Sequence, residues 1–251
     1  MSIKDNIATV TFNRPEALNS IPVSAYYELI DLFETLESDS EVRVAILTGA
    51  GRGFCSGGDI SEMIGGHGGV SPLFDHMQLC TKTSLALVHF SKPLIAAVNG
   101  AATGAGFNIA ISCDIAYASE KAKFSQIFGQ VGLCVDFAGT YLLPRLVGRA
   151  RAKELVFTKR IVTATEAKEL GIVQEVYPAD ELYDAAKALA KQIAEGPAMS
   201  YAMAKQMINR SFETDVRTML DFEGYAQTVC GTGADHEEGV KAFIEKRKPQ
   251  F

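Results

Sequence analysis

Two glycine-rich stretches decide the fold of this chain: Gly53-Phe54-Cys55-Ser56-Gly57-Gly58-Asp59 and Asn99-Gly100-Ala101-Ala102-Thr103-Gly104-Ala105-Gly106. Each follows an apolar run typical of a buried strand, and each precedes a helical pattern. Small residues let the backbone approach a ligand closely and direct its N–H groups at one point. Either stretch alone could be an ordinary turn. Together they favour a site in which one amide from each loop holds an oxygen that becomes negatively charged, an oxyanion hole.

Strand and helix patterns alternate in the first two-thirds of the chain, which becomes mostly helical after Gly139. The predicted strands are residues 7–12, 42–47, 93–98, 115–118, 123–125 and 172–177. The predicted helices are residues 24–36, 60–64, 73–89, 107–113, 149–158, 163–170, 179–195, 198–228 and 236–246. This order predicts an α/β core, residues 1–195, followed by a helical C-terminal region, residues 196–251. Such a region cannot bury all its apolar faces alone, so we expect it to pack on another subunit.

Composition indicates a soluble enzyme rather than a nucleic-acid or membrane protein. The chain has 251 residues, 47% hydrophobic and 22% charged, with a net charge of −6 and no long basic run. No nucleic-acid partner is therefore expected. No signal peptide and no apolar run of the roughly 18 residues that span a membrane are present, so no membrane partner is expected. Five scattered cysteines predict free thiols in a reducing compartment, the cytoplasm, and no cluster has metal-ligand spacing.

The residues around the two loops resemble the crotonase family, the enoyl-CoA hydratase/isomerase superfamily. The resemblance runs in one order over essentially the whole chain, through segments 12–19, 53–63, 93–114, 142–145, 164–173 and 238–248. It implies a β-β-α spiral core with a helical C-terminal trimerisation region, assembled as a homotrimer or homohexamer. It also implies an acyl-CoA thioester substrate and no separate cofactor, because CoA enters as part of the substrate.

The resemblance assigns roles to particular positions. It places the two oxyanion amides at Gly58 and Ala105. It places on the CoA and adenine side of the site Ala17, Leu18, Ser56, Gly57, Asp59 and Ile60. Two positions near the C-terminus, Phe243 and Lys246, match residues that reach the CoA of a neighbouring subunit.

One departure from the family pattern predicts the chemistry. Family hydratases carry two glutamates around the substrate, but the matching positions here hold Asn108 and Phe128. Adding water requires one group to activate the water and another to deliver a proton, and neither carboxylate is present. Asp136 lies in a segment that resembles the one where certain family isomerases carry a single catalytic aspartate. Its apolar neighbours, Leu133 to Val135 and Phe137, should raise its pKa and make it a better base.

One carboxylate beside an oxyanion hole predicts an isomerase that moves a double bond by a 1,3-proton shift. The resemblance leaves two substrates open: a Δ3-enoyl-CoA, or the ring-epoxide CoA thioester of the phenylacetate-pathway branch. The alternatives are an enoyl-CoA hydratase with atypical residues and a non-catalytic acyl-CoA-binding homologue. Asn108 could be a hydrogen-bonded polar residue beside the pocket or a substrate contact, and Phe128 should form an apolar wall.

Four other features of the sequence allow competing interpretations. Cys55 sits in a G-x-C-x-G pattern that could suggest a nucleophile, but a small buried residue explains it better. Tyr117 and Lys121 imitate a dehydrogenase motif, but the glycine spacing fails, and residues four apart in an extended strand lie too far from each other to act together. Asp59 precedes a short helix and is better explained as its N-cap than as a base. His67 is either a loop residue or a contact for the acyl end.

Overall fold

The computed structural model describes residues 1–63 and 68–251, and within them the strands form two sheets. In these residues the larger sheet has six strands in the order β1-β2-β3-β5-β7-β10, parallel except for the β1–β2 pair. The smaller sheet there has four, in the order β4-β6-β8-β9, with only β9 antiparallel. The strands are β1 Ser2–Lys4, β2 Ile7–Phe12, β3 Val44–Gly49, β4 Gly53–Cys55, β5 Leu94–Val98, β6 Ala101–Thr103, β7 Ile115–Ser119, β8 Lys123–Ser125, β9 Val162–Thr163 and β10 Glu175–Tyr177.

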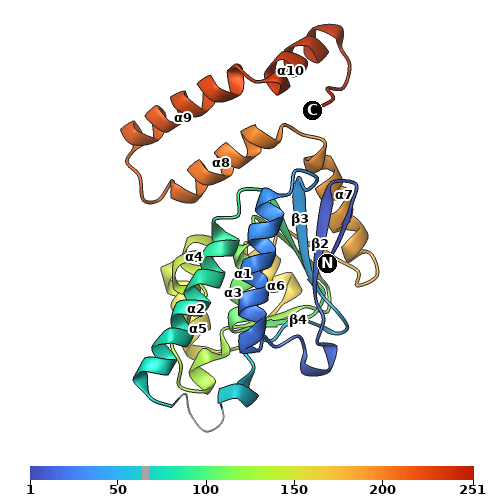
Figure 1. Ribbon diagram of the computed structural model, residues 1–251. Helices are drawn as coiled ribbons and strands as arrows, with labels where there is room; N and C mark the ends of the chain where they lie inside the picture. Colours follow the sequence, from blue (N-terminus) through green and yellow to red (C-terminus); the bar gives the residue numbers. More distant parts are fainter. Residues whose placement is uncertain (64–67) are drawn as a thin grey trace.

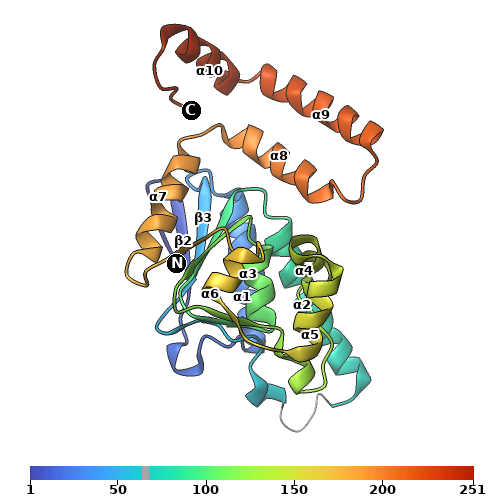
Figure 2. The same cartoon turned by 180° about the vertical axis from the view of Figure 1, so that it is seen from behind.

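Helices cover both faces of the larger sheet (Figures 1 and 2). Those of the core are η1 Pro15–Ala17, α1 Val23–Ser38, η2 Ile60–Met63, α2 Val70–Val88, α3 Ala105–Ser112, η3 Ile127–Gln130, α4 Gly139–Val147, α5 Arg149–Thr158, α6 Ala164–Glu169 and α7 Leu182–Ala194. Three more follow at the C-terminal end: α8 Ala198–Arg210, α9 Val216–Gly231 and α10 Ala234–Glu245.

The chain passes from the larger sheet to the smaller sheet and then to a helix in successive turns. The turns are β3–β4–α2, β5–β6–α3 and β7–β8–η3. Because each turn places its strands beside those of the turn before, the result is the expected β-β-α spiral. The predicted fold class is confirmed.

The side chains of the central strand β3 point alternately to the two faces of the sheet, which explains why helices flank both faces. Val44 and Ile46 face α7, where they pack in a cluster with Ala186 and Ala190. Ala45 and Leu47 face the opposite side and join the main core. All of these side chains are fully buried. A strand that is apolar at every position, with period-two side-chain direction, requires cover on both faces.

Two details of the predicted elements are corrected by the structure. Residues 198–228, predicted as one helix, form α8 and α9 with a break between them. At that break Asp215 accepts hydrogen bonds from the N–H groups of Arg217 and Thr218, so it caps a new helix. The second correction concerns the two predicted glycine-rich loops: their residues Gly53–Cys55 and Ala101–Thr103 form the short strands β4 and β6.

The C-terminal helices lie beyond one end of the core, with α8 between the core and the α9–α10 segment (Figures 1 and 2). One anchor is Lys205 of α8, whose Nζ donates to Asp114 Oδ2 at 2.7 Å and to the carbonyl of Lys92 at 2.9 Å. Every residue of α8 and α9 is described, and none is buried. In the described ranges no helix combines the length and hydropathy needed to cross a membrane.

Candidate active site

The two glycine-rich stretches lie side by side because the strands that begin them pair with each other. β4 and β6 are parallel neighbours, with Gly53 opposite Ala101 and Cys55 opposite Ala102. Parallel strands end at the same edge of a sheet, so the loops that follow must emerge together. A Cβ on Gly57 would lie 3.0 Å from the Thr103 carbonyl oxygen and 3.3 Å from the Ala105 nitrogen. The predicted convergence of the two loops is therefore present.

The first loop is held by a bridge to Ile21. The N–H of Ile21 donates to the Gly57 carbonyl at 2.8 Å, and the N–H of Asp59 donates to the Ile21 carbonyl at 3.0 Å. In such a bridge the amide of the intervening residue points to the opposite side of the backbone. The N–H of Gly58 is thus directed away from Ile21, and its role as an oxyanion donor stays a prediction.

The second amide belongs to the first turn of α3. Ala105 begins this helix, so its N–H lies outside the helix's own hydrogen-bond ladder. Gly104 just before it has φ +55° and ψ −126°, a conformation that favours glycine. A Cβ on Gly106 would overlap the Cys55 carbonyl. These glycines allow the start of α3 to lie against the first loop, and the helix end contributes its positive dipole there.

Asp136 lies in the segment between η3 and α4. Its Oδ1 is buried and has no hydrogen-bond partner in the part of the chain that the structure describes. Burial raises the pKa of this carboxyl to about 6. Phe137, which follows it, is 4% exposed and has a left-handed φ of +47°. The predicted direction of the pKa shift is found. Of the apolar neighbours expected to cause it, Phe137 is buried, whereas Leu133 and Cys134 are exposed.

Asn108 and Phe128 occupy different environments. Asn108 is fully buried on α3; its Oδ1 accepts from Gln126 Nε2 at 2.7 Å, and its Nδ2 donates to the Asp136 carbonyl at 2.8 Å. Of its two possible roles, the structure favours the hydrogen-bonded polar residue, and direct substrate contact stays a prediction. The ring of Phe128 is 8% exposed and lies near Gly104, whose Cβ would be 3.8 Å from the Phe128 Cζ. An aromatic ring thus adjoins the second loop.

Three residues near Asp136 were not identified from the sequence. The hydroxyl of Tyr26 on α1 hydrogen-bonds the thiol of Cys80 on α2, and His76 Nε2 lies 3.6 Å from that sulfur. The Tyr26 ring packs on Phe137 with 5.7 Å between centroids. Burial first, and then the nearby Cys80 and Asp136, raise the pKa of Tyr26, so its hydroxyl stays protonated. Helical spacing predicted only that α1 and α2 bury one face; no motif marks these side chains.

The residues predicted for the CoA side gather around the first loop. The Leu18 carbonyl accepts from the N–H of Ser56 at 3.1 Å, and Ser56 Oγ donates to the Ala17 carbonyl at 3.4 Å. Leu18 itself has a left-handed φ of +50°. Gly57 and Gly58 continue directly from Ser56. Binding of CoA by these residues stays a prediction.

Asp59 has a structural role in the same region. Its Oδ1 accepts from the N–H and the hydroxyl of Ser61, which caps η2, and its Oδ2 pairs with Arg14 Nη1 at 2.9 Å. The Ser61 and Arg14 hydrogen bonds hold the pKa of Asp59 below its usual value. Ile60, the next residue, is 54% exposed. A cavity of about 470 Å³ adjoins this region, lined in part by Arg14, Asn19 and Ile21.

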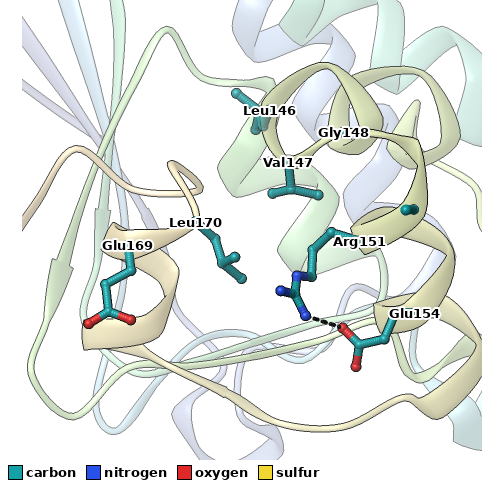
Figure 3. A pocket seen from close by; sticks show the side chains of 8 residues that line it. Leu146, Val147, Gly148, Arg151, Glu154, Glu169 and Leu170 are labelled. Atoms are coloured by element: carbon teal, nitrogen blue, oxygen red, sulfur yellow. Dashed lines mark hydrogen bonds and ion pairs between the residues drawn. The ribbon is translucent and has the colours of Figure 1, made fainter.

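Phe243 and Lys246 do not join this site within one chain. Both lie at the C-terminal end of α10, and Phe243 is 86% exposed. In Figures 1 and 2, α10 and the start of α2 lie at opposite ends of the molecule. Another surface cavity, of about 650 Å³, lies between the α4–α5 junction and α6 (Figure 3), and no predicted site residue lines it.

The alternative readings find little support in the geometry. Cys55 is fully buried, and burial raises the pKa of its thiol to about 12, so it would not form a thiolate nucleophile. Tyr117 lies in β7, as predicted, with its ring 5.2 Å from that of Tyr177. His67 lies outside the described residues. No group of three potential metal ligands occurs in the residues that the structure describes.

Comparisons with known proteins agree with the fold. A crystal structure of an enoyl-CoA hydratase from Mycobacterium smegmatis matches with a TM-score of 0.93 and 33% identity, covering 100% of this chain and 96% of that one. The fold and the paired loops thus define a crotonase-type protein. The family model described as enoyl-CoA hydratase/isomerase matches residues 2–251. The chain belongs to the enoyl-CoA hydratase/isomerase family.

Its relatives in sequence include both kinds of enzyme. The 1,2-epoxyphenylacetyl-CoA isomerase of Escherichia coli is 38% identical over 99% of this chain and 96% of its own length. The short-chain-enoyl-CoA hydratase of Clostridium acetobutylicum is 41% identical over 96% of this chain and 92% of its own length. The family therefore makes an acyl-CoA thioester the expected class of substrate, while the reaction has to be argued from the site.

Proposed function

We propose that this protein is an acyl-CoA isomerase that moves a double bond through a thioester enolate. The observation that carries the proposal is the Asp136 carboxyl, which has a raised pKa and a buried oxygen without a hydrogen-bond partner among the described residues. The positions that resemble the hydratase glutamates hold an amide, Asn108, and an apolar ring, Phe128. One base without a second carboxylate suits proton transfer between two carbons better than addition of water.

The reaction follows from this arrangement. The Asp136 carboxylate removes a proton from the carbon α to the thioester, and the electrons of that C–H bond move onto the thioester oxygen. The N–H groups of Gly58 and Ala105 hold the resulting enolate oxygen. Asp136, now protonated, returns the proton two carbons away, and the enolate electrons move back to form the conjugated double bond. The proton count is unchanged, and no cofactor is needed beyond the CoA of the substrate.

Two acyl groups fit this chemistry. The proposed substrates are a Δ3-enoyl-CoA and a ring-epoxide CoA thioester, and the name of the E. coli relative supports the second. A hydratase with atypical residues is the alternative, which the C. acetobutylicum relative supports.

A panel of CoA thioesters in deuterated water tests the proposal. The panel should contain a 2-enoyl, a 3-enoyl and a ring-epoxide thioester, with products followed by mass spectrometry and NMR. We expect a double-bond or ring shift accompanied by deuterium at the α or γ carbon. Formation of 3-hydroxyacyl-CoA from the 2-enoyl thioester faster than any such shift would make the protein a hydratase. Binding with neither reaction would make it an acyl-CoA-binding homologue.

The same proposal includes assembly and location. The C-terminal helices expose large apolar side chains, among them Phe212, Leu220, Tyr225, Phe243 and Ile244. A surface of this kind favours packing against other copies of the chain, so we infer a homotrimer or homohexamer in which Phe243 or Lys246 serves a neighbour's CoA. None of the five cysteines forms a disulfide, which supports a cytoplasmic location.

A further inference from the structure

A buried pair of amide side chains holds the backbone of Asp136. Gln126, 1% exposed, donates from Nε2 to Asn108 Oδ1, and Asn108, fully buried, donates from Nδ2 to the Asp136 carbonyl at 2.8 Å. The same carbonyl accepts from the N–H of Gly139 at 2.9 Å. The three residues Gln126, Asn108 and Asp136 come from different parts of the chain: the residue before η3, the helix α3 and the segment before α4.

The segment that carries Asp136 needs this support. Phe137 and Ala138 have left-handed φ angles of +47° and +57°, which residues with a Cβ adopt at a cost of about 1–3 kcal/mol each. Gly139 is required beside them, because a Cβ there would overlap the Asn108 carboxamide. The amide pair therefore fits closely against a strained turn and keeps it in one conformation.

The same pair joins Asp136 to the oxyanion loop. Asn108 lies three residues after Ala105 on α3, so both are on one face of one short helix. Gln126 follows Ser125, whose carbonyl accepts from the N–H of Gly104 at 3.0 Å. The Asp136 backbone and the Ala105 amide are thus fixed to the same two elements, α3 and the end of β8.

We propose that Asn108 and Gln126 are positioning residues for Asp136 in the reaction proposed above, on which this inference rests. They touch no reacting atom; they fix the distance between the base and the oxyanion amide of Ala105. Both amides are neutral, so they place no charge beside the carboxyl. Two titratable groups of the described residues that interact with it, Tyr26 from α1 and Cys80 from α2, are kept protonated by their raised pKa values. His76 of α2 lies beside Cys80, with its Nε2 3.6 Å from the Cys80 sulfur.

The test compares variants that remove the support with one that removes a similar hydrogen bond elsewhere. Asn108→Leu and Gln126→Leu should lower kcat for the isomerisation roughly 10- to 100-fold, because misplacing a reacting group by about 1 Å has effects of that size. KM for the thioester should change by less than about threefold, since the oxyanion and CoA contacts remain. The matched control is Gln174→Leu: Gln174 Oε1 accepts from the N–H of Ala116 at 2.6 Å in the larger sheet, and kcat should be unchanged there.

A double-mutant cycle separates positioning from general structural damage. In an Asp136→Asn background, Asn108→Leu should cause no further loss in the deuterium exchange that remains, because the group it positions is gone. An equal loss in both backgrounds, or the same kcat loss in Gln174→Leu, would overturn the inference. If Asn108→Leu does not fold, the same cycle is run with Gln126→Leu, which leaves the Asn108–Asp136 bond in place.

The two proposals fail in different ways. Near-normal turnover by Asp136→Asn would remove the proposed function and this inference with it. An inactive Asp136→Asn beside fully active, folded Asn108→Leu and Gln126→Leu would leave the proposed function standing and overturn only the positioning role.

Discussion

Asp136 combines two properties that seldom occur in a carboxyl without a function. Its Oδ1 is buried without a partner in the described residues, and burial raises its pKa to about 6. A buried polar atom without a hydrogen bond destabilises a fold by about 1–3 kcal/mol. Such an atom persists where the unsatisfied group serves the chemistry. The chain thus keeps a poorly solvated base, next to a strained turn, at the place where the proposed reaction needs one.

The activity of an Asp136→Asn variant is the first prediction. An amide cannot accept the α proton, so isomerisation should fall by roughly 10²–10⁴-fold. Binding of the CoA thioester should be largely retained, since the loop amides are unchanged. Steady-state kinetics together with calorimetric titration of a non-reactive CoA thioester would measure both quantities. Turnover close to that of the wild type would rule out Asp136 as the proton carrier.

The pH dependence of the same residue is the second prediction. The base must be ionised, so kcat/KM should rise with pH through an inflection near the Asp136 pKa of about 6. Stability should change with pH in the opposite direction. Folding raises the pKa of this carboxyl above its value in the unfolded chain, so the protonated group stabilises the fold at low pH. That contribution is lost as the pH rises through about 6.

Urea unfolding of wild type and Asp136→Asn at pH 5 and pH 8 measures this linkage. Between pH 5 and pH 8, the unfolding free energy of wild type should fall relative to that of the variant by on the order of 1 kcal/mol. A stability difference independent of pH would show that the Asp136 pKa is ordinary.

At the scale of elements, pairing of β4 with β6 sets the position of the oxyanion loops. Gly106 lies where α3 crosses Cys55, and a Cβ there would overlap the Cys55 carbonyl. The third prediction is that Gly106→Ala forces α3 away from the first loop, lowering stability by about 1–3 kcal/mol and reducing kcat strongly. Gly231→Ala is the matched control, because nothing lies within 4 Å of a Cβ at that helical position. Thermal unfolding with the isomerisation assay would compare them; equal effects would contradict the close-packing argument.

The sequence predicted the elements whose patterns are long and missed those whose signals are short. Apolar runs and glycines located β3, β5 and the two loops, so the fold class and the convergence of the loops could be predicted. The strands β4 and β6 have three residues each, mostly small ones, which is too short for a period-two pattern. The break before α9 lacks glycine or proline, and its only signal was the capping residue Asp215.

Within the site, a residue marked by its own sequence segment could be predicted, and residues brought there by tertiary packing could not. Asp136 could be proposed because its segment, residues 132–136, resembles the one that carries the aspartate in certain family isomerases. Tyr26, His76 and Gln126 could not, because they reach the Asp136 region only through the packing of α1, α2 and the end of β8. Their roles depend on tertiary contacts such as the Tyr26–Phe137 ring pair, and no spacing in the sequence encodes such a contact.

The whole molecule has an exposed apolar end and a core that contains the proposed catalytic residues. The fourth prediction is a trimer-based assembly, because α8 to α10 leave residues such as Phe212 and Phe243 uncovered at 75% and 86% exposure. Sedimentation at micromolar concentration should detect it. A monomer would contradict the shared-site proposal.

The fifth prediction concerns Lys246, at the C-terminal end of α10. Lys246→Ala should weaken binding of CoA roughly fivefold at low salt and less at high salt, because a lysine–phosphate contact at a surface is screened. Lys241→Ala on the same helix is the control. Dephospho-CoA, which lacks the 3′-phosphate, should bind both variants and the wild type alike; a loss of its binding in Lys246→Ala would contradict the assignment.

The pairing of β4 with β6 also means that the chain between the two strands can change in length while the amide donors keep their positions. Hydrogen bonds between the two strands bring the two amide donors together, although most of residues 56–100 separate them in the chain. Loop-closure entropy grows only slowly, by about 0.6 kcal/mol for each doubling of a flexible segment. Insertions into this crossover could therefore reshape the space around an acyl group while the enolate-binding amides stay in place.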